Sequence, residues 1–357
     1  MMISIFGNGK LTNGLAQNLL ENVSCPIMIL TRTSYSSINT VSIVMNNDTK
    51  KSFDVTFKLP HECINTLTKR MSDKNIRVAY ININDPFLAD IINNSSIIFS
   101  CAREGLIDTY EKILNSLSLT QDLFIVSLDN DEKIYKTAND YNTNPHVFYI
   151  KGVAHAVITS TEAHGELLIC QSHGRSSIFL PPECFNPMHE VLQSFPVIIK
   201  QSLLKICSSH EELKNIIELK RCDINAPHSS LAFLCLNKAI NMNIPFKTAL
   251  NLPLCKFIDT KEAINISRIM RLSCRQHYIH GAINEPYFAF DDFINYIVSE
   301  PSEHIKRGFP AYGATASKHW DDIDYIIAAL QDEYSKNKVL INTITSAKDN
   351  ILANMKA

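Results

Sequence analysis

Three side chains near residue 220 have the types and the spacing to act on one oxygen atom of a substrate. Lys220 is followed by Asn225 and His228 in the run Lys-Arg-Cys-Asp-Ile-Asn-Ala-Pro-His. If burial lowers the pKa of the lysine enough to populate the neutral amine, Lys220 can take a proton from a hydroxyl group. The amide and the imidazole can hydrogen-bond the same oxygen. This set suits the metal-independent interconversion of an alcohol and a carbonyl compound.

Two local signals predict how the chain positions these side chains. Ser209 and Glu212 form the Ser-x-x-Glu pattern of a capping box, which predicts the start of the helix whose end presents Lys220. A second helix that begins near Pro227 would place Asn225 and His228 one turn apart. The alternative interpretation is a solvated lysine, an asparagine that caps a helix and a surface histidine.

A glycine-rich turn follows a short apolar run at the start of the chain. Residues 2–6 are followed by Gly7-Asn-Gly9 and then by an amphipathic segment, which predicts a strand, a tight turn and a helix. In folds that bind dinucleotides, the first glycine makes the turn and the second lets the backbone approach the pyrophosphate. The usual third glycine is replaced by Thr12, and Gly14 could supply the close helix–sheet approach. The residues expected to bind the cofactor here are Gly7, Asn8, Gly9, Lys10 and Leu11.

The second apolar run, residues 26–30, ends at Thr31-Arg32-Thr33. An NAD-binding site would have an acidic residue at about this place to bond the ribose, and none is present. Arg32, with the hydroxyls of Thr33 and Ser34, could instead bind a 2′-phosphate. This favours NADP as the cofactor, with NAD as the second choice; the alternative is an exposed loop arginine.

Strand patterns alternate with helical patterns in the first half of the chain, and helical periodicity replaces them from residue 188. This predicts an α/β fold, with a Rossmann-type dinucleotide-binding domain over 1–187 and an all-helical substrate domain over 188–357. A hairpin joins 41–45 to 53–57. The further expected strands are 2–6, 26–30, 77–81, 96–100 and 123–127. The expected helices are 106–117, 188–206, 209–219, 227–242, 261–272, 290–299, 323–337 and 341–355.

In such sheets ligands bind at the carboxyl ends of the strands. Cys101 and Arg103 follow the strand at 96–100, so we expect them to contact the cofactor. Asn130 follows the strand at 123–127 and could complete the polar cluster around the substrate oxygen. The alternative for Asp-Asn-Asp at this place is a turn or a helix cap.

Three segments resemble the polyol-specific long-chain dehydrogenases, the family of mannitol dehydrogenase, mannitol-1-phosphate 5-dehydrogenase and the fructuronate and tagaturonate reductases. They are Phe-Gly-x-Gly-x4-Gly at residues 6–14, Ile-Val-Ser-Leu-Asp-Asn at 125–130 and Lys-x4-Asn-x2-His at 220–228. The resemblance implies Lys220 as general base in alcohol oxidation and general acid in carbonyl reduction. It implies that Asn130 and Asn225 stabilise the alkoxide and that His228 orients the substrate.

The sequence departs from this family at two places. The Asp-Arg pair expected near His155-Ala156 is missing, and Arg175 lies where the family has an acidic and then aromatic pattern. Arg175 could bind a carboxylate or phosphate of the substrate, and the alternative is a surface loop. The missing pair leaves open the hypothesis of a catalytically silent dinucleotide-binding regulator. The related architecture of a dinucleotide domain and a helical domain leaves open a 2-keto acid or imine reductase.

Composition limits the partners. A chain of 357 residues with a net charge of −2 has no electrostatic footprint for nucleic acid. No apolar run reaches membrane-spanning length and no leader pattern precedes the first strand, so we expect a cytoplasmic protein that binds a small polyol or sugar-type molecule, as a monomer or homodimer. Ten cysteines without a Cys-x-x-Cys pair predict free, buried thiols.

A metal site is the weakest of the hypotheses. Cys274, His277 and His280 have ligand-type side chains at helix-compatible spacing, and three such groups can hold zinc. A fourth ligand is not evident from the sequence. We therefore expect no metal.

Overall fold

The chain forms two compact units, Met1–Leu213 and Lys214–Ala357. The computed structural model describes residues 2–7, 10–32, 38–45, 50–101, 122–128, 146–154, 158–163, 166–171, 176–179, 204–249, 252, 254–279, 294–295, 298 and 317–356.

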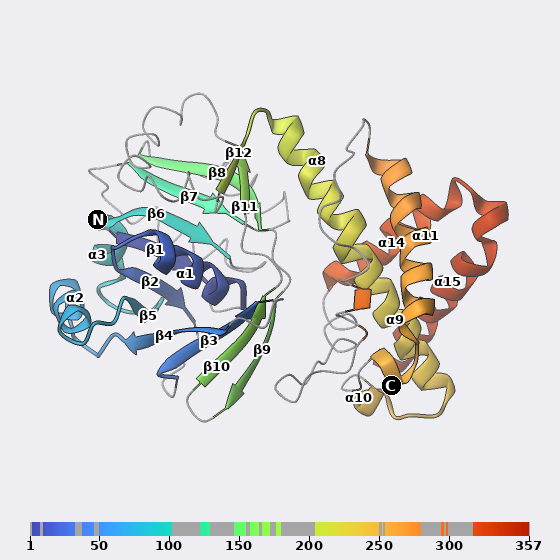
Figure 1. Ribbon diagram of the computed structural model, residues 1–357, viewed down its shortest axis with the longest axis horizontal. Helices are drawn as coiled ribbons and strands as arrows, with labels where there is room; N and C mark the ends of the chain where they lie inside the picture. The colour runs from blue at the N-terminus through green and yellow to red at the C-terminus, as the bar shows by residue number, and fades with distance from the viewer. Residues whose placement is uncertain are drawn as a thin grey trace. The chain divides into compact units, whose positions relative to one another are not determined.

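The centre of the first unit is a parallel sheet with the strand order β8-β7-β6-β1-β2-β5-β4 (Figure 1). These strands are β1 (Met2–Phe6), β2 (Ile27–Thr31), β4 (Lys50–Phe57), β5 (Val78–Asn82), β6 (Ser95–Ser100), β7 (Leu123–Ser127) and β8 (Val147–Ala154). From β1 the chain builds outward through β2 and β5 on one side, and through β6, β7 and β8 on the other. This reversal of strand order is the doubly wound arrangement of Rossmann folds, and it confirms the predicted fold class.

Further strands extend both ends of this sheet. β3 (Thr40–Met45) pairs antiparallel with β4, which confirms the predicted hairpin. Beyond it lie β10 (Glu166–Gln171), parallel to β3, and β9 (Ile158–Ala163), antiparallel to β10. At the other end β11 (Ser176–Phe179) pairs antiparallel with β8, and β12 (Leu204–Cys207) pairs parallel with β11. The described strands thus form one twelve-stranded sheet.

β12 corrects the predicted helix over 188–206. Residues 204–206 are extended and pair with β11, while 180–203 lie outside the described residues. In Leu-Lys-Ile-Cys the apolar residues alternate with a lysine, and pairing with β11 favours the strand over the helix. The sheet therefore gains a strand after residue 187, and the compact units divide at Leu213.

Both faces of the central sheet are buried, which explains the nearly continuous apolar strands. Alternate side chains of β1 point to opposite faces. Ile3 and Ile5 pack in one core with α1 (Lys10–Asn22). Met2 and Phe6 pack in a second core with α2 (Ile64–Asp73) and α3 (Leu88–Asn93).

The described residues after Lys214 form helices and contain no strand, in agreement with the predicted helical C-terminal region. They are most of α8 (His210–Lys220), the π-helical segment Arg221–Asn225, α9 (Ala226–Asn241), α10 (Phe246–Ala249), α11 (Thr260–Tyr278), α14 (Ser317–Gln331), α15 (Tyr334–Lys356) and the short 3-10 helix Leu254–Lys256. The helices predicted at 227–242, 261–272 and 341–355 are confirmed.

The helix predicted over 323–337 is interrupted at Asp332 and Glu333, between α14 and α15. Buried Asn337 donates its side-chain amide to the carbonyl of Leu330, which satisfies the end of α14 without a continuing helix. The helix predicted over 106–117 lies outside the described residues, and so does most of 290–299. None of the helices that the structure describes combines the length and the apolar character needed to cross a bilayer.

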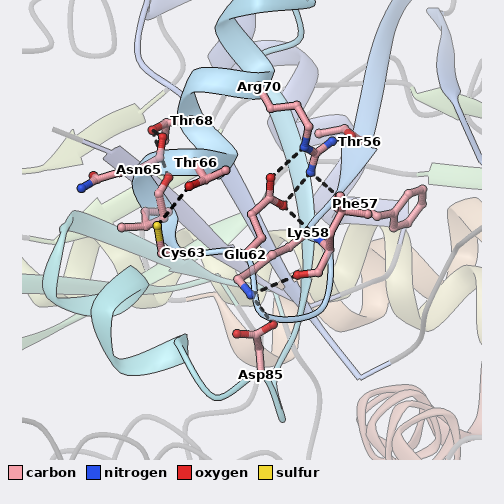
Figure 2. A network of polar contacts seen from close by, with 12 residues as sticks. Thr56, Phe57, Lys58, Glu62, Cys63, Asn65, Thr66, Thr68, Arg70 and Asp85 are labelled. Carbon is pink, nitrogen blue, oxygen red and sulfur yellow. Dashed lines mark hydrogen bonds and ion pairs between the residues drawn. The ribbon is translucent and has the colours of Figure 1, made fainter.

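A network of charged side chains ties together the connections that follow β4 and β5 (Figure 2). Arg70 of α2 donates two hydrogen bonds, each of 2.8 Å, to the two carboxylate oxygens of Glu62. It also donates to the carbonyl of Phe57 at 2.7 Å. The Arg70 guanidinium holds the pKa of the Glu62 carboxyl below its usual value. Lys58, whose side chain is 1% exposed, bonds Asp85 at 2.7 Å. These contacts hold the loops at the carboxyl ends of β4 and β5.

Of the eight cysteines whose exposure the structure describes, four are buried as predicted, whereas Cys25, Cys101 and Cys255 are half-buried. Cys207, Cys222, Cys235 and Cys274 are buried and free, and burial raises the pKa of Cys235 to about 12. Cys63, at the start of α2, is exposed. A hydrogen bond between the Cys63 sulfur and the Thr66 hydroxyl, at 3.2 Å, lowers the pKa of the Cys63 thiol (Figure 2). For Cys63 the prediction of a buried thiol is therefore wrong.

This difference predicts selective alkylation. With iodoacetamide near neutral pH, Cys63 should react faster than the other seven cysteines whose exposure the structure describes, because the thiolate is the nucleophile. Thr66→Val should slow the reaction about fivefold, the worth of one hydrogen bond. Thr68→Val is the matched control, because its hydroxyl donates to the Ile64 carbonyl. Peptide mapping by mass spectrometry measures the rates, and equal slowing by both variants would contradict this account.

Candidate functional site

The carboxyl ends of β1, β2 and β6 meet where the strand order reverses. The Gly7 N–H donates to the Leu30 carbonyl of β2 at 2.9 Å, and the Cys101 N–H donates to the Phe6 carbonyl at 2.9 Å. Gly7, Thr31 and Cys101, three residues expected to bind a cofactor, therefore lie on neighbouring strand ends. Doubly wound sheets bind their ligands at this position.

The backbone at Gly7 requires glycine. Its φ is +135°, and a Cβ atom there would lie 3.0 Å from Thr12 Oγ1 and 3.3 Å from the carbonyl carbon of Cys101. α1 begins at Lys10, and the first N–H groups of a helix have no partner within that helix. The tight glycine turn and the nearby helix N-terminus fit the pyrophosphate of a dinucleotide.

Two neighbouring side chains of α1 complete this turn. Thr12 occupies the place of the usual third glycine, and its buried Oγ1 has no hydrogen-bond partner among the described residues. Asn13, also buried, accepts a hydrogen bond from the Tyr80 hydroxyl of β5 and so anchors α1 on the sheet. Gly14 is buried in the same helix. The Asn13–Tyr80 contact was not foreseen, because its partners are far apart in the sequence.

Arg32 lies at the predicted place, directly after β2, and is exposed. The preceding residue, Thr31, is buried and accepts a hydrogen bond from the Ile83 N–H at 3.0 Å. The connection after β5 therefore runs beside the end of β2. An exposed basic side chain thus follows β2, near the place where the ribose of a dinucleotide lies in folds of this order.

Several predicted residues lie outside the described part of the chain. They are Asn8, Gly9, Thr33, Ser34, Arg103, Asn130, His155, Ala156, Arg175 and His280. Asn130 follows β7 in the sequence, and β7 ends at Ser127 on the same edge of the sheet as β1 and β6.

In the second unit, the candidate catalytic residues lie on one uninterrupted helical run. α8 (His210–Lys220) continues through a π-helical segment, Arg221–Asn225, into α9. Lys220 ends α8 and is 7% exposed, while His228 lies in the first turn of α9. Ser209 Oγ accepts from the Glu212 N–H at 3.1 Å, and the Glu212 carboxylate accepts from Ser208, so the predicted cap at the start of α8 is confirmed.

The π-helical segment explains the spacing of five between Lys220 and Asn225. In an α-helix, residues five apart lie about 140° apart around the axis. A π turn instead closes between residues five apart, and here the Ala226 N–H donates to the Arg221 carbonyl. The segment thereby brings Lys220 and Asn225 toward one side of the helix, with His228 one turn further along.

The alternative interpretation of this segment is wrong in two respects. Lys220 is buried rather than solvated. Asn225 has helical backbone angles, φ −66° and ψ −49°, and its side chain makes no capping hydrogen bond. α9 also continues from α8 instead of starting anew near Pro227. Because proline cannot donate to the carbonyl four residues earlier, Pro227 favours a local departure from α-helical bonding, and the π segment ends just before it.

Charged contacts tether the π segment to two neighbouring helices. On one side, buried Asp223 bonds Arg271 and Arg275 of α11. On the other side, Arg221 donates to Asp322 of α14 at 3.1 Å, and its guanidinium lies 4.0 Å from the ring centre of Tyr325. The sequence contains these charges, but their partners were not identified from it.

Tyr325 joins the same segment through its hydroxyl. It donates to Glu218 at 2.7 Å and lies 3.2 Å from the Cys222 sulfur. The Tyr278 ring stacks on the Tyr325 ring, with 3.7 Å between the ring centres. Burial raises the pKa of Tyr278 to about 12. The side of the helix that carries Glu218 and Cys222 is therefore filled by aromatic rings.

Cys274 and His277, two residues of the hypothetical metal site, contact side chains that do not belong to it. A hydrogen bond with Cys222, together with burial, raises the pKa of the Cys274 thiol. His277 Nδ1 lies 2.6 Å from the Asp332 carboxylate. Within the described ranges, no group of three or more His, Cys, Asp or Glu side chains is arranged to hold a metal ion.

Comparison with known protein families and with curated proteins finds no match to this sequence. Among solved structures, the chain is similar to 2-dehydropantoate 2-reductase from Porphyromonas gingivalis W83 (11% identity, 99% of both chains, TM-score 0.45). It is also similar to D-mandelate dehydrogenase with NADH and anilino(oxo)acetate (11% identity, 98% of this chain and 99% of that chain, TM-score 0.48). A third is glycerol-3-phosphate dehydrogenase from Plasmodium falciparum (10% identity, 100% of this chain and 94% of that chain, TM-score 0.44). At these identities and scores the likeness decides neither cofactor nor substrate.

The turn at Gly7 predicts a stability change. Gly7→Ala should lower the free energy of unfolding by about 1–3 kcal/mol, because alanine is strained at a positive φ and its Cβ meets Thr12 and Cys101. Urea unfolding measures the change. Ser24→Ala, at an exposed position outside helices and strands, should change it by less than about 0.5 kcal/mol. A Gly7→Ala protein as stable as wild type would contradict this backbone geometry.

Proposed function

We propose that the protein is an NAD(P)-dependent oxidoreductase that interconverts an alcohol and its carbonyl compound without a metal. In this proposal the N-terminal sheet domain binds the dinucleotide, and the C-terminal helical domain supplies the acid–base residue. The turn at Gly7, at the reversal of strand order and before the N-terminus of α1, is the observation that carries the proposal.

The residues proposed to hold the pyrophosphate are Gly7, Asn8, Gly9, Lys10 and Leu11, with Cys101 at the end of β6 and Arg103, which follows it in the sequence. The first N–H groups and the positive end of α1 favour a negatively charged group at the start of this helix. When bound, the dinucleotide supplies a nicotinamide ring that can accept or release a hydride. Arg32, with Thr31 and Thr33, is proposed to bind the 2′-phosphate of NADP, and NAD is the second choice.

Lys220 is proposed to transfer the proton of the reacting oxygen. In this proposal the amine of buried Lys220 takes the hydroxyl proton during oxidation and returns it during reduction. Asn225 and Asn130 would donate hydrogen bonds to the developing alkoxide, and His228 would orient the hydroxyl group. The π-helical segment supports this assignment, because it turns Lys220 and Asn225 toward one side.

The proposed substrate is a polyol or a sugar-derived alcohol, with Arg175 available for a carboxylate or phosphate group. A second candidate is a 2-keto acid or imine reductase, which would use the related architecture of a dinucleotide domain and a helical domain. Turnover on ketoses, hexuronates and sugar phosphates, compared with 2-keto acids and imines, separates the two. Cofactor binding without turnover of any of them would favour a silent dinucleotide-binding regulator.

Cofactor choice can be tested at Arg32. Arg32→Ala should weaken NADPH binding by about 1.5–3 kcal/mol, the range for hydrogen bonds to charged groups, and leave NADH binding almost unchanged. Fluorescence titrations with NADPH and with NADH measure the two dissociation constants. Lys69→Ala removes another exposed cation of the same unit and should change neither. A wild-type protein that binds NADH as tightly as NADPH would contradict the role of Arg32.

The catalytic role can be tested with Lys220→Met, which keeps most of the buried side-chain volume. Turnover should fall by at least about a hundredfold, the usual effect of removing a positioned acid or base, while NADPH binding is retained. Lys214→Met changes an exposed lysine of the same helix and is the control. Near-normal turnover of Lys220→Met in a steady-state assay would overturn the assignment.

A further inference from the structure

We propose that Asp223, Arg271 and Arg275 form a clamp that holds the π-helical segment in shape, and that Asp223 is a positioning residue for Lys220 and Asn225. The effect on catalysis rests on the proposed function, whereas the effect on the helix does not. None of the three touches the reacting atoms in this proposal.

The contacts of Asp223 fix its carboxylate in both position and plane. Oδ1 accepts from Nε of Arg271 at 3.0 Å and from Nε of Arg275 at 2.7 Å. Oδ2 accepts from Nη2 of Arg271 at 3.1 Å and from Nη2 of Arg275. Asp223 is 2% exposed, so solvent hardly weakens these bonds. Two paired, charge-assisted contacts with arginine leave the carboxylate little freedom to rotate.

The clamp uses α11 as its fixed support. Arg271 and Arg275 are four residues apart and therefore lie on one face of this 19-residue helix. α11 also buries Ala263, Met270 and Cys274, which hold it in the helical core. Asp223 thus bonds two points of a helix that is itself anchored by apolar packing.

A π segment needs such a support because it departs from the usual hydrogen-bond ladder. π-Helical turns are rare and occur as single turns inside α-helices. If Arg221–Asn225 relaxed to α-helical bonding, Lys220 and Asn225 would point about 140° apart. Asp223 lies in the middle of the segment, so the same relaxation would turn its carboxylate away from α11. The four bonds to Asp223 therefore oppose the change that would separate Lys220 from Asn225.

A second tether holds the beginning of the segment. Arg221 donates to the Asp322 carboxylate at 3.1 Å and to the Asp321 carbonyl at 3.3 Å, and it lies over the Tyr325 ring. This contact fixes the first residue of the segment but leaves the turn after it free to adjust. The bonds of Asp223 constrain the turn itself.

Stability alone is a poor explanation of this buried cluster. Buried ion pairs often contribute no more to stability than well-packed apolar side chains of similar volume. They do impose a defined direction on the groups that they join. Direction is what a catalytic lysine and asparagine on one helix require, because small misplacements are costly in rate.

The test uses Asp223→Asn in the full-length chain, with two independent measurements. Hydrogen exchange followed by mass spectrometry reads the backbone amides of 221–226, which should exchange at least about tenfold faster when the segment opens more often. Steady-state kinetics should show kcat lowered by about a hundredfold, with the KM for NADPH nearly unchanged. A change confined to kcat separates positioning from a general loss of folded protein.

Matched variants keep the test decisive. Glu62→Gln removes a carboxylate that likewise grips an arginine through two N–H groups, in the other unit, and should change neither measurement. Arg275→Lys keeps the positive charge but loses the paired geometry, so its effects should be intermediate between those of wild type and Arg275→Gln. If Asp223→Asn does not fold, Arg275→Lys carries both measurements.

Each outcome has one meaning. Unchanged exchange over 221–226 in a folded Asp223→Asn protein overturns the clamp. Faster exchange with wild-type kcat overturns the positioning role. A wild-type protein that reduces no carbonyl compound overturns the proposed function, and the exchange measurement still decides whether the clamp exists.

Discussion

The pairing of β1 with β2 on one side and with β6 on the other is the constraint on which the sheet unit depends. The chain first adds strands on the β2 side of β1 and then adds strands on the β6 side. The strand order therefore reverses at β1. The chain must turn there without a side chain, and Gly7 with its φ of +135° meets that requirement. The backbone bonds from Gly7 to β2 and from Cys101 to β1 then bring three strand ends together. This local geometry supports the proposal of a dinucleotide site.

In the helical unit the main constraint is the direction in which polar side chains point from one long helix. Lys220 and Asn225 are five residues apart, so in an α-helix they would point to different sides. The π-helical segment between them turns them toward one side. The segment contacts α11 through Asp223 and α14 through Arg221. Ion pairs thus hold the backbone beside the candidate catalytic residues, whereas apolar packing holds the central strands of the sheet unit.

The sequence predicted the features that depend on neighbouring residues. Strands such as β1 and β7 are buried on both faces, so short apolar runs were enough to locate them. The cap at Ser209 and the turn at Gly7 are also local. Features that depend on distant partners were missed: Asp223 bonds residues 48 and 52 positions away, and β12 is a strand because β11 pairs with it. Pro227 was read as the start of a helix, since proline gives the same signal at a helix start and after a π turn.

The central claim is that this protein moves a hydride between a dinucleotide and a carbonyl carbon. Deuterium transfer tests it most directly: wild-type protein is incubated with NADPH carrying deuterium at C4 of the nicotinamide, on the transferable side, and with a panel of ketoses, hexuronates, sugar phosphates and 2-keto acids. Mass spectrometry of the products should find an alcohol with one carbon-bound deuterium, and Lys220→Met should form it much more slowly. NADPH binding with no deuterium in any product would contradict the claim.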